Sequence, residues 1–382
     1  MENQATFPYQ GAIDADGHIL EPPDTWERYI DPKFRDRAIR IVKDHDGLEI
    51  LEIGGRPSKY RRPGQLAQSG AMGKSGEELL PSPNRTYVNQ APFGSMDPKE
   101  RLALLKKDGL DKAIIYPTLG LAWETEDVGD LELQAAYARA YNRWVVDFCA
   151  DSGGRLVPIA HISFGEPTEA ARELERAAKA GCRGAFFVPF TPTYKSHAHP
   201  DYDRFWAAAQ EMNMPLSLHI LTGRKGMGID FFSGSILIQG STLHHQVERS
   251  IAVFTLGGVL ERFPRLRIIS AENDVAWMAY FLWRMDMIHE RLGGLAPVKL
   301  NLKPSEYVKR QVYTTFINEP VFISELHRWG ADNIMWSSDY PHLAATFPRS
   351  REFVEKTFSG LPAEERRKIV HDTAAQVYGI AD

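Results

Sequence analysis

The sequence predicts a (β/α)₈ barrel, because helical and strand patterns alternate along most of the chain and eight separate strands can be counted. From about residue 97 onward, segments with helical periodicity alternate with short apolar runs, as they do in successive βαβ units. The segment AIDADGH at 12–18 supplies the first strand. Eight parallel strands separated by helices close naturally into a barrel with right-handed crossovers.

The remaining elements are expected in a regular order. The first half should contain helix 97–107, strand 111–118, helix 131–150, strand 155–164, helix 167–180 and strand 182–189. The second half should contain helix 201–213, strand 215–220, helix 245–263, strand 266–273, helix 275–292, strand 311–317, helix 319–329, strand 333–339 and a helical tail at 349–378. Gly181, Pro215 and Pro264 mark helix ends.

Residues 38–96 interrupt this alternation. Two alternating runs, AIRIVKD and LEILEIGG, flank the turn signal Asp46-Gly47, and a segment rich in Gly, Pro and Ser follows. We interpret the stretch as a β-hairpin plus a long loop inserted after strand one. Because the barrel pattern resumes afterwards, residues 1–382 are predicted to form a single domain. The insertion would serve as a lid over the active-site mouth or as an oligomer contact.

Composition and charge narrow the class of protein. A formal net charge of -5 and a pI near 6.2 argue against a nucleic-acid partner, so a small-molecule substrate is expected. Only Cys149 and Cys182 occur, which disfavours a disulfide framework and a zinc-thiolate site. The N-terminus lacks the pattern of a signal peptide and no apolar run approaches 18 residues, so we expect a cytoplasmic protein without a membrane span.

Potential metal ligands gather at predicted strand ends. Alternation places Asp14, Asp16 and His18 on one face of the first strand, and two of them can reach one ion. His219, Glu272 and Asp339 end the fifth, sixth and eighth strands. Taken singly, each has an ordinary structural explanation as a rim histidine or a helix cap. In a barrel, however, the C-terminal strand ends supply the active-site groups. Imidazole and carboxylate together suit zinc, manganese or iron.

The chain resembles the amidohydrolase superfamily, in the branch that includes aminocarboxymuconate-semialdehyde decarboxylase and related aromatic-acid decarboxylases. The stretches that carry the resemblance are DADGHILEPPDTWERYIDP, MPLSLHI, LGGVLERFPRLRIISAEN, AWMAYFLWRMD and IMWSSDYPH. The resemblance implies metal binding by His18, His219 and Asp339. Asp16 stands where many members have the first His of an HxH pair, and Glu272 where many have an acid/base His. The extra carboxylate favours manganese or iron.

More potential ligands are present than one ion needs. Glu21, Glu272 and the pair His244-His245 form this surplus. Because the same branch includes dinuclear iron or manganese–iron oxygenases, one or two ions per chain remain open. The full set of candidate ligands is Asp16, His18, Glu21, His219, His245, Glu272 and Asp339.

Catalytic and substrate-binding roles follow from position. In hydrolysis, Asp339 would take a proton from metal-bound water; in decarboxylation, Asp339 or Glu272 would deliver a proton to carbon. His342 follows Asp339 by three residues, close enough to bind substrate or a carboxylate. Arg224, Trp123 and Phe231 lie in loops after strands and are candidates for contacting an anionic, aromatic substrate. His161, at the end of strand three, is a weaker candidate, and His197 and His199 are expected in solvent.

Three hypotheses remain open from sequence. The first is a metal-dependent enzyme that acts on a small carboxylate or amide. It would be either a lyase, namely a non-oxidative decarboxylase, or a hydrolase. The second is a dinuclear oxygenase, motivated by the surplus ligands. The third is a non-catalytic barrel that partners a homologous subunit, motivated by Asp16 and Glu272 in place of two histidines. A homodimer is the expected assembly, with the insertion or the aromatic helix 275–292 as the contact.

Overall fold

The fold is a (β/α)₈ barrel, as the sequence predicts. One eight-stranded sheet has the order β1-β5-β6-β7-β8-β9-β10-β11, and helices alternate with its strands along the chain. The computed structural model describes residues 11–59, 61–121, 123–126, 128–189, 191, 195–220, 222, 235–242 and 244–380.

By its internal contacts the chain divides into two compact units. The first comprises residues 1–161 and 336–359, and the second comprises residues 162–335 and 360–382. The assignment of residues 1–382 to one domain stays a prediction. Within the described ranges, none of the helices combines the length and apolar character that a membrane span requires.

The first unit is built on three parallel strands. β1 (Ala12–His18) pairs with β5 (Leu110–Tyr116), and β5 pairs with β6 (Leu156–His161). The helices between them begin at carboxylate caps, because Asp97 accepts two backbone N–H groups at the start of α2 (Pro98–Asp108) and Asp130 does the same for α3 (Leu131–Cys149). The short helix α1 (Thr25–Tyr29) and helix α12 (Ser350–Thr357) complete the unit.

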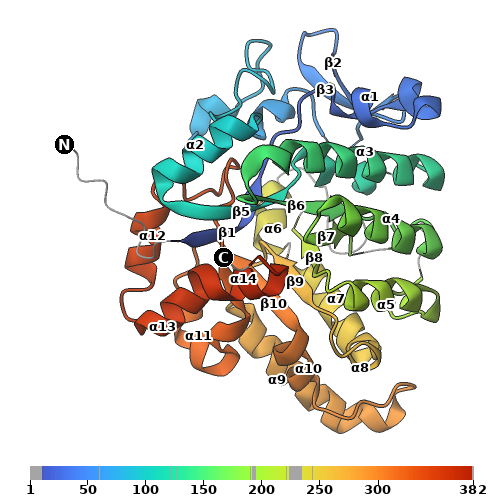
Figure 1. Cartoon of the computed structure of the whole chain (residues 1–382), viewed down its shortest axis with the longest axis vertical. Helices are drawn as coiled ribbons and strands as arrows, with labels where there is room; N and C mark the ends of the chain where they lie inside the picture. The colour runs from blue at the N-terminus through green and yellow to red at the C-terminus, as the bar shows by residue number, and fades with distance from the viewer. Residues whose placement is uncertain are drawn as a thin grey trace. The chain divides into compact units, whose positions relative to one another are not determined.

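The predicted hairpin is present in the same unit. β2 (Arg40–Lys43) runs antiparallel to β3 (Glu49–Ile53), near α1 in Figure 1. Gly47 lies in the turn at φ 77°, a conformation that glycine adopts without steric cost. A third short strand, β4 (Arg56–Pro57), was not expected from the sequence.

The second unit holds strands that pair in parallel in the order β7-β8-β9-β10. Their bounds are β7 (Gly184–Phe187), β8 (Leu216–His219), β9 (Ile268–Ala271) and β10 (Val312–Phe316), and β11 (Ile334–Trp336) lies at the junction of the two units in sequence. Helices α4 (Pro167–Ala180) and α5 (Asp203–Glu211) pack together, as Figure 1 shows.

The later helices of this unit depart from the prediction in two ways. The expected helix 245–263 is divided into α7 (His244–Leu256) and α8 (Val259–Arg262), because Gly258 adopts a left-handed backbone at φ 77°. Helices α6 and α10 were not expected. The remaining bounds are α6 (Ser235–Thr242), α9 (Trp277–Leu292), α10 (Pro304–Gln311), α11 (Phe322–Trp329), α13 (Ala363–Arg367) and α14 (Thr373–Tyr378).

His197 corrects the expectation of a solvated loop histidine. Its ring is buried and stacks on Phe254 with 5.7 Å between ring centroids, while Trp206 donates its indole N–H to the His197 carbonyl at 3.1 Å. Burial lowers the pKa of His197 to about 4, so the ring is neutral at physiological pH. His197 is buried because it packs in an aromatic cluster, and this tertiary contact is not visible in the local sequence.

Strand β1 contains an irregularity that positions its side chains. Its pairing register with β5 shifts between Asp14 and Gly17, so strict alternation does not hold there. A Cβ atom added to Gly17 would lie 2.7 Å from Nη2 of Arg101 and 2.8 Å from Oδ2 of Asp14. Both neighbouring side chains are fully buried, so glycine is the residue that fits.

We therefore expect Gly17→Ala to lower the free energy of unfolding by roughly 1–3 kcal/mol, the usual cost of overpacking a buried site. Urea denaturation followed by far-UV circular dichroism measures this. Gly360→Ala is the control, because an added Cβ there meets nothing within 4 Å. Equal stability of the two variants would contradict the packing assigned to Gly17.

Candidate metal centre

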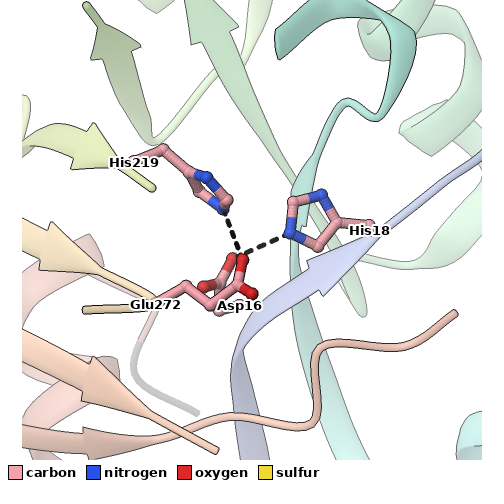
Figure 2. Close-up of side chains that lie close together, drawn as sticks. All are labelled: Asp16, His18, His219 and Glu272. Carbon is pink, nitrogen blue, oxygen red and sulfur yellow. Dashed lines mark ion pairs between the residues drawn. The ribbon is translucent and has the colours of Figure 1, made fainter. Parts of the chain in front are cut away.

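In the first unit, β1 directs a carboxylate and an imidazole toward each other. Oδ1 of Asp16 lies 3.4 Å from Nε2 of His18, and both side chains are fully buried (Figure 2). Oδ1 of Asp339, which follows β11, lies 3.8 Å from the same nitrogen. One imidazole nitrogen therefore faces two carboxylates in a water-poor environment.

The protonation of His18 is set by a backbone carbonyl. Its Nδ1 lies 2.7 Å from the carbonyl oxygen of Pro117, and a carbonyl only accepts, so Nδ1 carries a proton and donates it. In the neutral ring, Nε2 then presents a lone pair to the carboxylates. This is the arrangement by which proteins orient a metal-binding histidine.

The second unit repeats the arrangement at the end of β8. Nδ1 of His219 lies 2.9 Å from the carbonyl oxygen of Ile220, and Nε2 lies 3.6 Å from Oε2 of Glu272 (Figure 2). His219 is fully buried, and the Glu272 side chain is 14% exposed. By the same reasoning, the neutral His219 ring turns a lone pair toward a carboxylate.

Two of these carboxylates stand on left-handed backbone. Glu272 has φ 56° and Asp339 has φ 54°, values that non-glycine residues seldom adopt. Hydrogen bonds hold both, because the Glu272 N–H donates to Oγ1 of Thr315 at 2.7 Å and the Asp339 N–H donates to the Asp16 carbonyl at 3.1 Å. Such conformations cost on the order of 1–3 kcal/mol each and concentrate at functional sites.

His342 extends the first unit's set. Its Nδ1 lies 2.8 Å from Oδ1 of Asp339, its Nε2 lies 2.9 Å from Oγ1 of Thr118, and its ring centroid lies 4.1 Å from that of His18. An ionised carboxylate only accepts, so His342 donates to Asp339. The hydroxyl of Thr118 fixes the other side of the ring.

Behind these residues lies a buried polar layer around Asp14, whose partners the sequence analysis missed. Asp14 accepts the N–H of Ser338 at 2.8 Å and its hydroxyl at 2.6 Å, and Arg101 donates to the His18 carbonyl at 3.2 Å. Arg101 also lies over the ring of Tyr340 at 4.2 Å. One signal was present in the sequence, since Arg101 occupies the same helical face as apolar residues of α2.

Two of the other predicted site residues, Glu21 and Trp123, are buried in the first unit, and two lie outside the described residues. Glu21 is fully buried and accepts backbone N–H groups from residues 118–120. Trp123 is fully buried, with its ring centroid 4.7 Å from that of His161, whose Nε2 lies 2.8 Å from Oε1 of Glu124. Arg224 and Phe231 lie outside the described residues.

His245 belongs to a group of its own. With His244 and Glu248, on the first turns of α7, it offers ligand atoms that all lie within 4.8 Å of one another. Burial and the neighbouring His245 lower the pKa of His244, which favours its neutral form.

The donor set of each unit fits a divalent transition metal. Each unit offers an imidazole nitrogen whose proton is placed on the opposite side of the ring, together with at least one carboxylate oxygen. Manganese, iron and zinc accept such mixed nitrogen and oxygen ligands. The buried carboxylates also need compensation for their charge, which a cation supplies.

The chain belongs to the amidohydrolase family, whose model matches residues 13–380. Among curated relatives, it is 29% identical over 237 residues to a protein named decarboxylase orsB of Emericella nidulans, covering 56% of this chain and 67% of the relative. It is 23% identical over 291 residues to gamma-resorcylate decarboxylase of a Polaromonas species, covering 73% of this chain and 86% of that relative.

Solved structures support the same fold. An amidohydrolase of Mycobacterium avium subsp. paratuberculosis superposes with a TM-score of 0.78 at 21% identity, covering 97% of this chain and 100% of that one. A dihydroxybenzoic acid decarboxylase of Polaromonas, with bound manganese and the inhibitor 2-nitroresorcinol, superposes with a TM-score of 0.64 at 18% identity. That superposition covers 97% of this chain and 98% of the decarboxylase.

Glu21 gives a testable pH dependence of stability. Burial raises its pKa from 4.5 to about 7, against the opposing effect of the backbone N–H groups. The folded state thus binds the proton more tightly than the unfolded state, so this contribution to stability is complete below about pH 4.5 and is lost as the pH rises to about 7. The change corresponds to roughly 3 kcal/mol.

We expect Glu21→Gln to flatten the pH dependence of the unfolding free energy between pH 4.5 and 7. Urea titrations of both proteins at closely spaced pH values measure the slopes. An unchanged slope in the variant would contradict the raised pKa.

Proposed function

We propose that this protein is a metal-dependent, non-oxidative decarboxylase acting on a small aromatic carboxylate. The observation that carries the proposal is the paired orientation of His18 and His219, each with Nδ1 held by a backbone carbonyl and Nε2 facing a carboxylate. Membership of the amidohydrolase family supports it, as do relatives that bear the name decarboxylase.

We further propose that Asp16, His18, His219 and Asp339 bind one divalent cation, with Glu272 beside them or as a further ligand. The support is the fold, because the C-terminal ends of barrel strands meet at one face. We favour manganese over zinc and iron, since Asp16 adds a hard oxygen ligand and a related decarboxylase structure contains manganese. His245, together with His244 and Glu248, is the candidate ligand set for a second ion.

When bound, the cation would supply charge that anchors the substrate carboxylate and a neighbouring hydroxyl oxygen. The chain's own groups then handle the proton. In the proposed reaction, a proton held by Asp339 or Glu272 is transferred to the ring carbon that bears the carboxylate. The bond between that carbon and the carboxylate breaks, carbon dioxide leaves, and the aromatic ring is restored. Mass and charge balance without an oxidant or a reductant.

Remaining site residues would orient these groups and the substrate. His342 donates to Asp339 and thereby stabilises the ionised carboxylate that remains once the proton has been transferred. We propose Trp123, Arg224 and Phe231 as substrate contacts, with the arginine suited to an anionic group.

We also propose a cytoplasmic homodimer. The chain has only two cysteines, both of them buried, which fits a reducing compartment. On α9, the side chains of Tyr280 and Trp283 are 62% and 57% exposed, and their rings contact each other at 5.7 Å. Such an exposed aromatic pair is a suitable subunit contact.

Removal of His219 tests the metal site. We expect His219→Ala to lose bound manganese, because it deletes a proposed nitrogen ligand. Elemental analysis after gel filtration measures ions per chain. The exposed histidine variant His199→Ala should keep the wild-type content, and full metal content in His219→Ala would count against the site.

The number of ions separates the two enzymatic hypotheses. A decarboxylase should perform its reaction with about one manganese ion per chain and without oxygen, whereas a dinuclear oxygenase needs about two ions that include iron. We expect one ion and release of carbon dioxide from 2,6-dihydroxybenzoate under anaerobic conditions. About two metal ions per chain, iron among them, together with oxygen-dependent turnover would instead establish the oxygenase.

Asp339→Asn, compared with the wild-type protein at equal manganese content, tests proton delivery. We expect a loss of at least roughly 100-fold in carbon dioxide release, since proton transfer by a positioned side chain typically contributes 10²–10⁴-fold. A variant with wild-type rate would exclude Asp339 from the reaction.

A further inference from the structure

Glu21 is a buried carboxylate whose hydrogen bonds point to a role that the sequence did not suggest. It follows β1 by three residues and has no measurable exposure. Oε1 accepts the N–H of Gly120 at 2.8 Å, and Oε2 accepts the N–H of Leu119 at 2.9 Å. The N–H of Thr118 lies 3.3 and 3.2 Å from the two oxygens. The carboxylate thus gathers three successive N–H groups of the loop after β5.

That loop holds two site histidines through different atoms. The carbonyl of Pro117 accepts from Nδ1 of His18 at 2.7 Å. The hydroxyl of Thr118 lies 2.9 Å from Nε2 of His342, which in turn lies 2.8 Å from Asp339. All of these residues belong to the first unit, so every step from Glu21 to the two histidines is a direct contact within it.

The backbone of the loop lies close against the carboxylate. A Cβ atom added to Gly120 would lie 3.1 Å from Oε1 of Glu21 and 2.7 Å from Cβ of Pro117. Glycine at this position is what lets the backbone approach the carboxylate closely. The segment before Glu21 is also fixed, because the Leu20 N–H donates to the Ser95 carbonyl at 2.8 Å.

We propose that Glu21 is a positioning residue for the metal centre: by holding residues 118–120 it sets the tautomer and direction of His18 and the placement of His342, and it does not itself bind the ion. The inference rests on the proposed function, because it assumes that His18 binds a cation. The lone pairs of the Glu21 carboxylate support this role, because each carboxylate oxygen already accepts two N–H contacts from the loop.

Manganese binding to the full-length protein tests the proposal, with the free ion measured by electron paramagnetic resonance. We expect Glu21→Gln to weaken manganese binding by about 10- to 100-fold, the usual effect of losing a group that orients a ligand. Gly120→Ala should weaken it as well, although it leaves the Glu21 carboxylate intact, because it displaces the loop. A direct ligand role for Glu21 predicts instead that the manganese peak in crystals of the wild-type protein lies within bonding distance of a Glu21 carboxylate oxygen.

Asp130→Ala is the matched control. Asp130 also accepts two successive backbone N–H groups in the first unit, at the start of α3, but it contacts none of the proposed ligands. It should lower the melting temperature while leaving manganese affinity at the wild-type value, which separates positioning from general stability.

Three results would overturn the proposal. The first is a wild-type affinity for manganese in Glu21→Gln. The second is weakened manganese binding in Glu21→Gln together with wild-type affinity in Gly120→Ala. The third is a weakening of manganese binding in Asp130→Ala equal to that in Glu21→Gln. If Glu21→Gln does not fold, Gly120→Ala alone decides by the same criterion. Failure of the wild-type protein to bind manganese would instead reject the proposed function, and this inference with it.

Discussion

The candidate site depends on one kind of interaction, the hydrogen bond from an imidazole Nδ1–H to a backbone carbonyl. Pro117 provides that carbonyl for His18, and Ile220 provides it for His219. With the opposite tautomer, each Nε2–H would donate to the neighbouring carboxylate, and the lone pair would lie on Nδ1, on the far side of the ring from the carboxylates. Two backbone oxygens therefore decide whether these buried groups are metal ligands or simple polar pairs.

The surrounding structure serves to keep that arrangement rigid. Left-handed backbone at Glu272 and Asp339 is retained because Thr315 and Asp16 hold the N–H groups of these residues. Burial removes competing water from His18 and Asp16, which strengthens every charge interaction around them. The chain accepts local strain and buried charge at strand ends, a pattern typical of sites selected for chemistry rather than for stability.

Local patterns in the sequence were sufficient for much of the fold. Strand 12–18 and helix 167–180 agree with β1 and α4 at both ends, and the Asp46-Gly47 signal correctly placed a hairpin turn. The break at Gly258 and helix α10 were missed, because periodicity does not reveal where a left-handed glycine ends a helix or where a short polar helix forms. The predicted helix boundaries were wrong where tertiary contacts, rather than local propensity, determine where a helix ends.

The site was predictable in part for a similar reason. Histidines and carboxylates at strand ends are visible in sequence, since a barrel brings such ends together. The groups that orient them are not visible, because His18 and Pro117 lie 99 residues apart and meet only in the folded chain. Glu21 illustrates the limit: its residue type suggested a ligand, whereas its contacts are with the backbone of residues 118–120.

The most direct measurement is an anomalous-difference map from crystals of the protein grown with manganese. The account predicts one strong peak within bonding distance of Nε2 of His18, Nε2 of His219 and the carboxylates of Asp16 and Asp339. Absence of a peak there, or a His18 ring turned so that Nδ1 faces Asp16, would contradict it.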